Sequence, residues 1–316
     1  MSALGELQRM RKGSGGTLGG NREGLTAKRD NQAAFVFLLP WFAGLLLITA
    51  GPIAASFILG FTDYNLIQPP VFNGLDNWIR MFSDERLHKA LGVTLVYVLV
   101  SVPLQLACAL ALALLLDRGL RGLAFYRSAF YLPSLLGSSV AIAVLWRQIF
   151  GADGLFNQVL AMVGIEGKGW ISDPGSALGT LIVLNVWTFG APMVIFLAGL
   201  RQIPAMYYEA AATDGAGKWT QFRKITIPLL SPIVFFNLVL QVIHAFQSFT
   251  QAFVVSGGSG GPSDSTLFYT LYLYQRGFGN FDMGYASALA WLLLVIIAAF
   301  TAINFWAAKF WVVYDD

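Results

Sequence analysis

Residues 91–116 read LGVTLVYVLVSVPLQLACALALALLL, a long apolar run that contains no charged side chain. An α-helix rises about 1.5 Å per residue, so about 20 apolar residues cross the hydrocarbon core of a membrane. The run is therefore long enough to span a bilayer as one helix. Five more stretches have the same character, and they are residues 33–60, 129–149, 178–200, 229–254 and 286–308.

The composition of the whole chain agrees with a membrane protein. Of its 316 residues, 56% are hydrophobic and only 12% are charged, and the mean hydropathy is +0.64. A soluble fold of this size cannot bury so much apolar surface, which argues against a soluble enzyme, a disordered chain and a nucleic-acid binder. Because no stretch shows the sustained alternation of a strand, we predict an all-α, polytopic membrane protein with about six transmembrane helices.

The N-terminal segment, residues 1–32, is polar and rich in glycine, and we expect it to be flexible and cytoplasmic. The apolar block that begins at Ala33 is longer than the core of a signal peptide, so we interpret it as a retained transmembrane helix. Residues 33–316 then form the membrane domain. With one cysteine, Cys108, and two distant histidines, the chain is not expected to form an internal disulfide or a Cys/His zinc site.

Lysine and arginine are distributed unevenly between the two sets of loops. The N-terminal segment, the second and fourth loops and the C-terminal tail together hold 14 of them, whereas the other loops hold 5. Lysine and arginine accumulate on the cytoplasmic side of membrane proteins. We therefore predict that both termini, and the loop of residues 201–228, lie in the cytoplasm.

The loop of residues 201–228 has a local structure that its sequence predicts. Pro204 suits the first position of a helix, and Gly215 suits the left-handed residue that follows a helix end. A second short helix, residues 218–225, is expected after the turn. The three alanines at 210–212 have little side chain, so a partner can approach closely. We interpret the loop as a rigid docking element; a solvated connector is the alternative.

Two acidic side chains in this loop, Glu209 and Asp214, offer carboxylates to a partner. The loop also carries a spaced motif, which consists of Glu209, Ala210, Ala211, Gly215, Ile225 and Pro228. This motif resembles the EAA motif of ABC importer permeases, in which the loop forms a coupling helix that sits in a cleft of the cytoplasmic ATPase. The resemblance implies that Glu209, Ala210, Ala211, Asp214 and Gly215 dock the ATPase.

The resemblance extends over nearly the whole chain, through residues 126–133, 146–157, 257–262 and 283–288. These stretches are similar to the MalF-type permeases of oligosaccharide and glycerol-phosphate importers, which have the type I importer fold. The large extracytoplasmic insertion of MalF is absent, so smaller loops must contact a binding protein. The implied partners are a second homologous permease, two copies of an ATPase subunit and an extracytoplasmic solute-binding protein. The implied location is the bacterial or archaeal cytoplasmic membrane.

The chain lacks a nucleotide site of its own. A phosphate-binding loop needs glycine where Ala212 stands and a hydroxyl residue where Trp219 stands. ATP and Mg²⁺ are therefore expected on the ATPase subunits, and the chain itself is expected to need no cofactor. Because the spans also contain no catalytic triad, metal cluster or carboxylate pair, we predict a transport subunit rather than an enzyme.

Placing a polar side chain inside a membrane costs free energy unless the side chain finds a partner or faces a cavity. Gln241, His244 and Ser248 are spaced to share one helical face, with Gln247 and Gln251 beside it. In the fourth span Asn185 and Thr188 share a face near Phe189. Amides, hydroxyls and aromatic faces suit a neutral sugar, although hydrogen bonding between helices would also account for them.

The resemblance favours the sugar. In MalF-type permeases the cargo lies between the helices on either side of the coupling loop. By ungapped matching, Asn185, Thr188, Phe189, Gln241, His244 and Ser248 fall on positions that line that site, and Gln247 lies beside them. His244 departs from the aromatic side chain expected there. It either makes a proton-sensitive hydrogen bond or packs as a neutral imidazole.

We predict the permease subunit of an ATP-driven importer of a di- or oligosaccharide. Glycerol 3-phosphate or another small polar solute is the alternative cargo, because Arg147 could face a phosphate, although snorkelling to the interface also explains Arg147. A secondary transporter is a weaker alternative, because the six spans contain no carboxylate. An intramembrane enzyme would need a catalytic cluster that the spans do not show.

Overall fold

The computed structural model describes residues 35, 37–119 and 122–313. The predicted flexible segment, residues 1–32, lies outside these described residues. The chain forms two compact units, Met1–Ile58 and Leu59–Asp316.

The first unit contains the first predicted span. Its described part is helical, with a π-helical turn, η1 (Leu45–Ala50), that leads into helix α3 (Gly51–Leu59). The N–H of Gly51 donates to the carbonyl of Leu46, and the next residue is Pro52, which has no N–H to donate. None of the residues in the most hydrophobic window of Phe37–Leu59 is buried within the chain, as expected of a helix that faces lipid.

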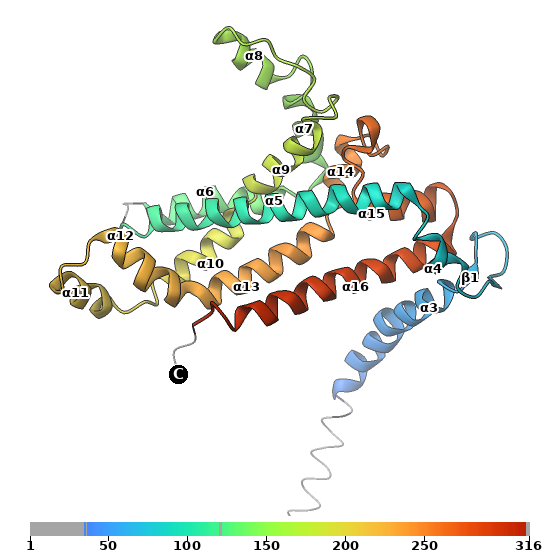
Figure 1. The fold of residues 1–316 in the computed structure, drawn as a ribbon, viewed down its shortest axis with the longest axis horizontal. Helices are drawn as coiled ribbons and strands as arrows, with labels where there is room; N and C mark the ends of the chain where they lie inside the picture. Colours follow the sequence, from blue (N-terminus) through green and yellow to red (C-terminus); the bar gives the residue numbers. More distant parts are fainter. Residues whose placement is uncertain (1–34, 36, 120–121, 314–316) are drawn as a thin grey trace, which may run out of the picture. The chain divides into compact units, whose positions relative to one another are not determined.

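The second unit is a bundle of helices with one two-residue strand pair (Figure 1). Its elements are β1 (Thr62–Asp63), β2 (Val71–Phe72), α4 (Asp76–Arg80), α5 (Glu85–Leu116), α6 (Leu123–Leu136), α7 (Val140–Ile149), α8 (Leu155–Met162), α9 (Ala177–Trp187), α10 (Gly190–Leu200), α11 (Ala205–Thr213), α12 (Lys218–Gln221), the π-helical turn η2 (Phe222–Thr226), α13 (Ile227–Phe246), α14 (Thr250–Val255), the 3₁₀ turn η3 (Pro262–Asp264), α15 (Tyr269–Tyr274), the π-helical turn η4 (Gln275–Gly279) and α16 (Met283–Ala308).

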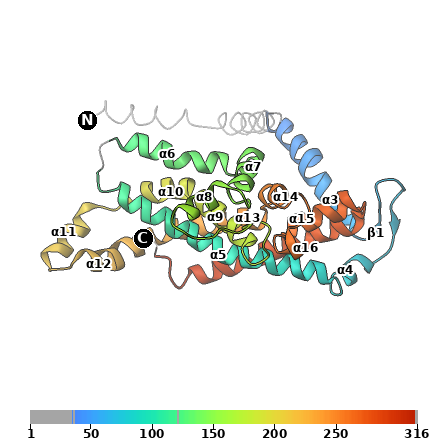
Figure 2. The same ribbon diagram turned by 90° about the horizontal axis from the view of Figure 1, so that it is seen from above.

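Helix α5 is the centre of the second unit. It packs against α9, α10, α13 and α15, and α13 packs in turn against α16 (Figure 2). Ala109 and Ala113 on α5 are completely buried, and their small side chains let neighbouring helices approach closely. Large side chains such as Phe196 and Phe246 fill the space between the helices.

Four helices of the described chain are long and apolar enough to cross a membrane, or six if each of two bent pairs forms one span. This confirms the predicted all-α fold with about six spans. The four are Phe37–Leu59, Glu85–Leu116, the run Lys218–Val255 and Met283–Ala308, and the bent pairs are α6 with α7 and α9 with α10.

The third predicted span is a bent pair of helices. Helix α6 begins before residue 129, and the chain bends by 95° between α6 and α7 (Figure 1). The bend follows from local chemistry, because Gly137 ends α6 and Ser139 adopts an extended backbone, where its hydroxyl caps α7 by accepting from the N–H of Ile142 at 3.3 Å. The fourth span bends less, by 41° at Thr188 and Phe189.

The fifth predicted span, residues 229–254, differs at both ends. The short helix expected at 218–225 is not separate, because α12 and η2 run directly into α13. Helix α13 then ends at Phe246, and residues 247–249 interrupt it before α14. Ser248 therefore does not share a helical face with Gln241 and His244, as the spacing had suggested.

At the end of the bundle that holds α4 and β1, a buried carboxylate joins three elements. The side chain of Asp84, 7% exposed, caps the N-terminus of α5 by accepting from two backbone N–H groups. Tyr272 and Tyr285 donate their hydroxyls to the same carboxylate, from α15 and α16. Burial alone would raise the pKa of Asp84, but these hydrogen bonds and Arg276 hold it below its ordinary value.

We expect Asp84→Asn to lower the thermal unfolding midpoint of the purified protein in detergent, because it weakens the helix cap and two hydrogen bonds at a cost of about 1–3 kcal/mol. Because the pKa of Asp84 is lower in the folded than in the unfolded protein, Asp84 stabilises the fold fully above its unfolded-state pKa of about 3.9. This stabilisation is lost as the pH falls through the lower pKa of the folded protein. The midpoint of the wild type should therefore fall more steeply below that pH than the midpoint of Asp84→Asn.

The exposed ion pair of Arg201 with Asp117, at 3.5 Å, provides the control. Arg201→Ala should change the midpoint less than Asp84→Asn, because exposed pairs contribute about 0–1 kcal/mol. Equal midpoints for Asp84→Asn and the wild type would contradict the role assigned to this carboxylate.

Candidate transport site and coupling loop

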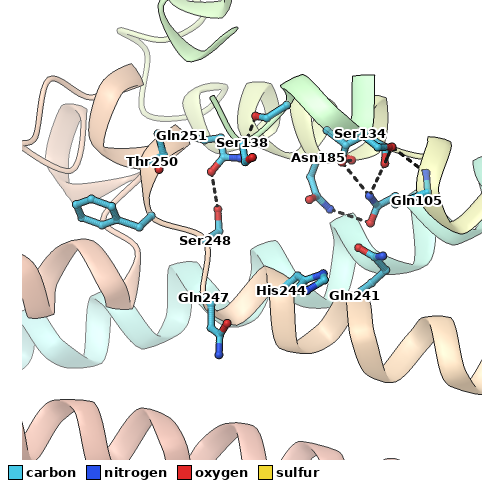
Figure 3. Close-up of a pocket in the computed structure, with 14 residues that line it drawn as sticks. Gln105, Ser134, Ser138, Asn185, Gln241, His244, Gln247, Ser248, Thr250 and Gln251 are labelled. Carbon is cyan, nitrogen blue, oxygen red and sulfur yellow. Dashed lines mark hydrogen bonds between the residues drawn. The ribbon is translucent and has the colours of Figure 1, made fainter. Parts of the chain in front are cut away.

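Three helix interruptions meet at one cavity of about 480 Å³ in the second unit (Figure 3). They are the bend between α6 and α7, the bend between α9 and α10, and the break between α13 and α14. The lining residues are Gln105, Ser134, Gly137, Ser138, Asn185, Thr188, Ala191, Gln241, His244, Gln247, Ser248, Phe249, Thr250 and Gln251.

The bend at Thr188 leaves backbone groups that side chains from two other helices satisfy. Gln105 donates its amide to the carbonyl and hydroxyl oxygens of Thr188, at 3.2 and 2.9 Å. Ser134 donates to the same carbonyl at 2.9 Å and accepts from the N–H of Ala191 at 2.8 Å. Asn185 reaches Gln105 at 3.4 Å. These polar groups hold the bent fourth span in place within the membrane.

A second link joins the other two interruptions. Gln251 donates to the carbonyl of Gly137 at 3.1 Å, and Ser248 donates to Gln251 at 3.1 Å (Figure 3). Gly137 is required where the bends approach each other, because a Cβ there would lie 2.2 Å from Cγ2 of Thr188. The cavity wall is thus built from backbone turns held by amide and hydroxyl side chains.

The cavity carries little charge. Among the described residues that line it there is no Asp, Glu, Lys or Arg, and His244 is the one titratable side chain. No hydrogen bond joins Gln241 or His244 to another residue drawn in Figure 3, whereas the amide of Gln247 points away from the other lining side chains. The cavity can therefore hydrogen-bond a polar, uncharged molecule through amides, hydroxyls and an imidazole.

The structure brings together most of the residues that the sequence singled out for cargo. Six of them line the cavity, and they are Asn185, Thr188, Gln241, His244, Gln247 and Ser248. Phe189 is not among the lining residues; its ring packs against Phe130, with centroids 6.0 Å apart. Asn185 and Thr188 also bond to Gln105 on α5, so the interhelical bonding considered as their alternative role is present.

Sequence reasoning missed Gln105, Ser134, Ser138 and Thr250 as lining residues. A signal existed for the first of them, because Gln105 is the only carboxamide in residues 91–116. Arg147, in contrast, is exposed near the end of α7 and does not line the cavity. Arg147, the residue that had suggested an anionic cargo, therefore lies outside this site.

The loop of residues 201–228 folds largely as predicted. Helix α11 starts one residue later than expected, because Pro204 is its N-cap rather than its first helical residue. Gly215 has φ of +81°, as predicted. The N–H of Ala216 bonds to the carbonyl of Ala211 at 2.8 Å, which closes the helix end in the usual left-handed cap.

Helix α11 projects from one end of the bundle (Figures 1 and 2). Glu209, Ala210 and Asp214 are exposed, and Ala211 is half-buried. On the inner side, the hydroxyls of Tyr208 and Thr226 lie 3.0 Å apart and connect α11 to η2. The loop is thus fixed to the fifth span and presents Glu209, Ala210 and Asp214 outward.

An all-α chain with several membrane-crossing helices, an uncharged polar cavity among them and a rigid exposed loop at one end is a membrane permease. Residues 86–311 match the family described as the binding-protein-dependent transport system inner membrane component, and the chain belongs to this family. It is therefore a multi-pass inner-membrane component of a transport system and is not an enzyme.

Curated relatives match over most of their length. The probable ABC transporter permease protein YesP of Bacillus subtilis is 51% identical, over 92% of this chain and 94% of the relative. The lactose transport system permease protein LacF of Rhizobium radiobacter is 31% identical, over 87% of this chain and 93% of the relative. The trehalose/maltose transport system permease protein MalF of Thermococcus litoralis is 30% identical, over 90% of this chain and 98% of the relative.

Solved structures support the fold. A chain of a bacterial ABC transporter involved in the import of the acidic polysaccharide alginate matches with a TM-score of 0.77. The match covers 91% of this chain and 98% of that chain at 21% identity. At this identity the likeness shows a shared fold, that of an ABC importer permease.

Proposed function

We propose that this chain is the permease subunit of an ATP-driven importer whose cargo is a neutral di- or oligosaccharide. The observation that carries the proposal is the uncharged cavity, which Gln241 and His244 line with groups that make no hydrogen bond to another residue drawn in Figure 3. Sugar hydroxyls both donate and accept hydrogen bonds, and carboxamides match them in both roles. The volume of about 480 Å³ falls in the range of about 300–1,000 Å³ that is typical of small-molecule sites.

The names of the relatives support the same class of cargo. LacF is named for lactose transport, and the MalF relative for trehalose and maltose. A third relative, 29% identical, is named for the transport of starch degradation products. An anionic cargo such as glycerol 3-phosphate remains the second candidate, but burying a phosphate would require a cation, and Arg147 lies outside the cavity.

The proposal includes the partners. We expect a second homologous permease, two ATPase subunits that bind ATP and Mg²⁺, and an extracytoplasmic solute-binding protein. One solved relative of similar fold is described in complex with a periplasmic protein bound to an alginate pentasaccharide. The ATPase is expected to dock on Glu209, Ala210, Ala211, Asp214 and Gly215, so that α11 and both termini face the cytoplasm, in agreement with the excess of lysine and arginine there.

The test is reconstitution of the whole complex in proteoliposomes with its binding protein. Uptake would be measured for labelled lactose, maltose, trehalose, maltotriose and glycerol 3-phosphate, with ATP inside the vesicles and with ADP as the control. We expect ATP-dependent uptake of at least one sugar and none of glycerol 3-phosphate. Uptake of glycerol 3-phosphate alone would contradict the proposed cargo, and sugar uptake that persists with ADP would contradict ATP-driven import.

His244 allows a separate prediction. Its side chain is exposed to the cavity and makes no hydrogen bond drawn in Figure 3, which favours contact with cargo over packing. His244→Phe is expected to lower sugar uptake, because phenylalanine keeps an aromatic ring but loses the ring nitrogens that hydrogen-bond sugar hydroxyls. Unchanged uptake would assign His244 a packing role.

A further inference from the structure

Beside the cavity, four aromatic rings form a continuous cluster, and of the four only Phe249 lines the cavity itself. Phe249 lines the cavity, and its ring centroid lies 5.2 Å from that of Tyr274. Tyr274 lies in turn 5.3 Å from Phe278. Phe253 packs against both Phe249 and Tyr274, at 5.3 and 5.5 Å, and supports them from the side.

The rings become more exposed with distance from the cavity. Phe249 is half-buried, Tyr274 is 38% exposed and Phe278 is 53% exposed. They come from two segments far apart in the sequence, the break before α14 and the stretch from the end of α15 into η4. Phe278 lies near the end of the bundle opposite α11, because its neighbour Arg276 reaches Asp84 at the start of α5.

We propose that Phe278, Tyr274 and Phe249 form an aromatic track along which a saccharide reaches the cavity from the end of the bundle opposite α11. This inference rests on the proposed import of sugar. A pyranose ring has a flat face of C–H groups that packs on an aromatic ring, while its hydroxyls point outward to water or polar groups. Because successive rings lie about 5 Å apart, the sugar can contact the next ring before it leaves the previous one. The track therefore assigns cargo contact to aromatic residues, next to the amides of the cavity.

Substitution by leucine separates a track from ordinary packing in lipid or against a partner subunit. Leucine keeps an apolar surface but removes the ring, so it preserves lipid packing and loses stacking. In the reconstituted complex, Tyr274→Leu and Phe278→Leu are each expected to reduce sugar uptake by about two- to tenfold, from the usual strength of aromatic contacts. Tyr274→Phe keeps the ring and should transport more than Tyr274→Leu.

Phe236 on α13 provides the matched control, because it has the same exposure, 53%, and does not line the cavity. Phe236→Leu should transport like the wild type. Each variant would be compared at equal membrane expression and after co-purification with its partners, which excludes failure to fold or assemble.

The outcomes are distinct. If the wild-type complex takes up sugar and both Tyr274→Leu and Phe278→Leu take it up equally well, the track is wrong and sugar import still stands. An equal loss in Phe236→Leu and Phe278→Leu would assign the effect to lipid packing and would also overturn the track. A wild-type complex that takes up no sugar of the panel would remove the proposed function and the track together.

Discussion

Gly215→Val and Ala211→Trp are expected to abolish transport while the membrane bundle still inserts and folds. Gly215 has φ of +81°, a conformation that costs a β-branched residue about 1–3 kcal/mol. No atom lies within 4 Å of the position of its missing Cβ, so the effect comes from the backbone and not from a clash. The helix end would rearrange and change the surface that α11 presents. Ala211→Trp would instead fill the space that a docked ATPase must occupy.

Gly217 supplies a control two residues away. It also has open space around the missing Cβ, but its φ is −68°, which valine adopts readily. Gly217→Val should therefore transport far better than Gly215→Val at equal expression. The measurements are sugar uptake, ATPase activity stimulated by the loaded binding protein, and co-purification of the ATPase. Normal stimulated ATPase and uptake in both Gly215→Val and Ala211→Trp would show that this loop does not couple the two subunits.

The coupling loop was predictable because its shape depends on neighbouring residues in the chain. A proline that limits the helix start and a glycine that accepts positive φ act within a few residues of their own positions. The structure places the helix start within one residue of the prediction and the left-handed residue at Gly215. The docking role of the loop is a separate matter, which rests on the resemblance and awaits the experiment above.

The membrane spans were also predictable, but their interruptions were not. Hydropathy reports the average cost of placing a stretch in lipid, and this average does not change when a helix bends. Whether residues 137–139 can break the third span depends on a partner for the freed carbonyl of Gly137, and that partner is Gln251, more than 100 residues later in the chain. Pairings of this kind become visible only when the helices are assembled.

The sequence grouped residues that line the cavity for a partly incorrect reason. Gln241, His244 and Ser248 were grouped because their spacing fits one helical face, yet Ser248 reaches the cavity from the break after α13. Polarity was the more reliable signal, because a polar side chain in a membrane must find a partner or a cavity whether its helix is continuous or interrupted. The same reasoning applied to residues 91–116 would have identified Gln105.

The roles of the cavity residues differ, and this decides which substitution tests cargo binding. Ser248 bonds to Gln251, which holds the carbonyl of Gly137, so Ser248→Leu would disturb the bends as well as the cavity. Gln241 makes no hydrogen bond to another residue drawn in Figure 3, so its replacement breaks none of the links that hold the bends. Gln241→Leu is the cleaner variant, and Ser248→Leu is expected to lower both uptake and thermal stability.

We expect Gln241→Leu to reduce sugar uptake strongly. A sugar hydroxyl left without a partner costs about 1–3 kcal/mol, which corresponds to about a tenfold to hundredfold loss of occupancy at this site. Capture of sugar by the binding protein should be unchanged, because it is a separate chain. Gln148→Leu is the control, since Gln148 is exposed and does not line the cavity. Uptake at equal expression, together with a structure that contains sugar, decides the matter, because wild-type uptake by Gln241→Leu or sugar bound away from Gln241 would exclude this cavity as the cargo site.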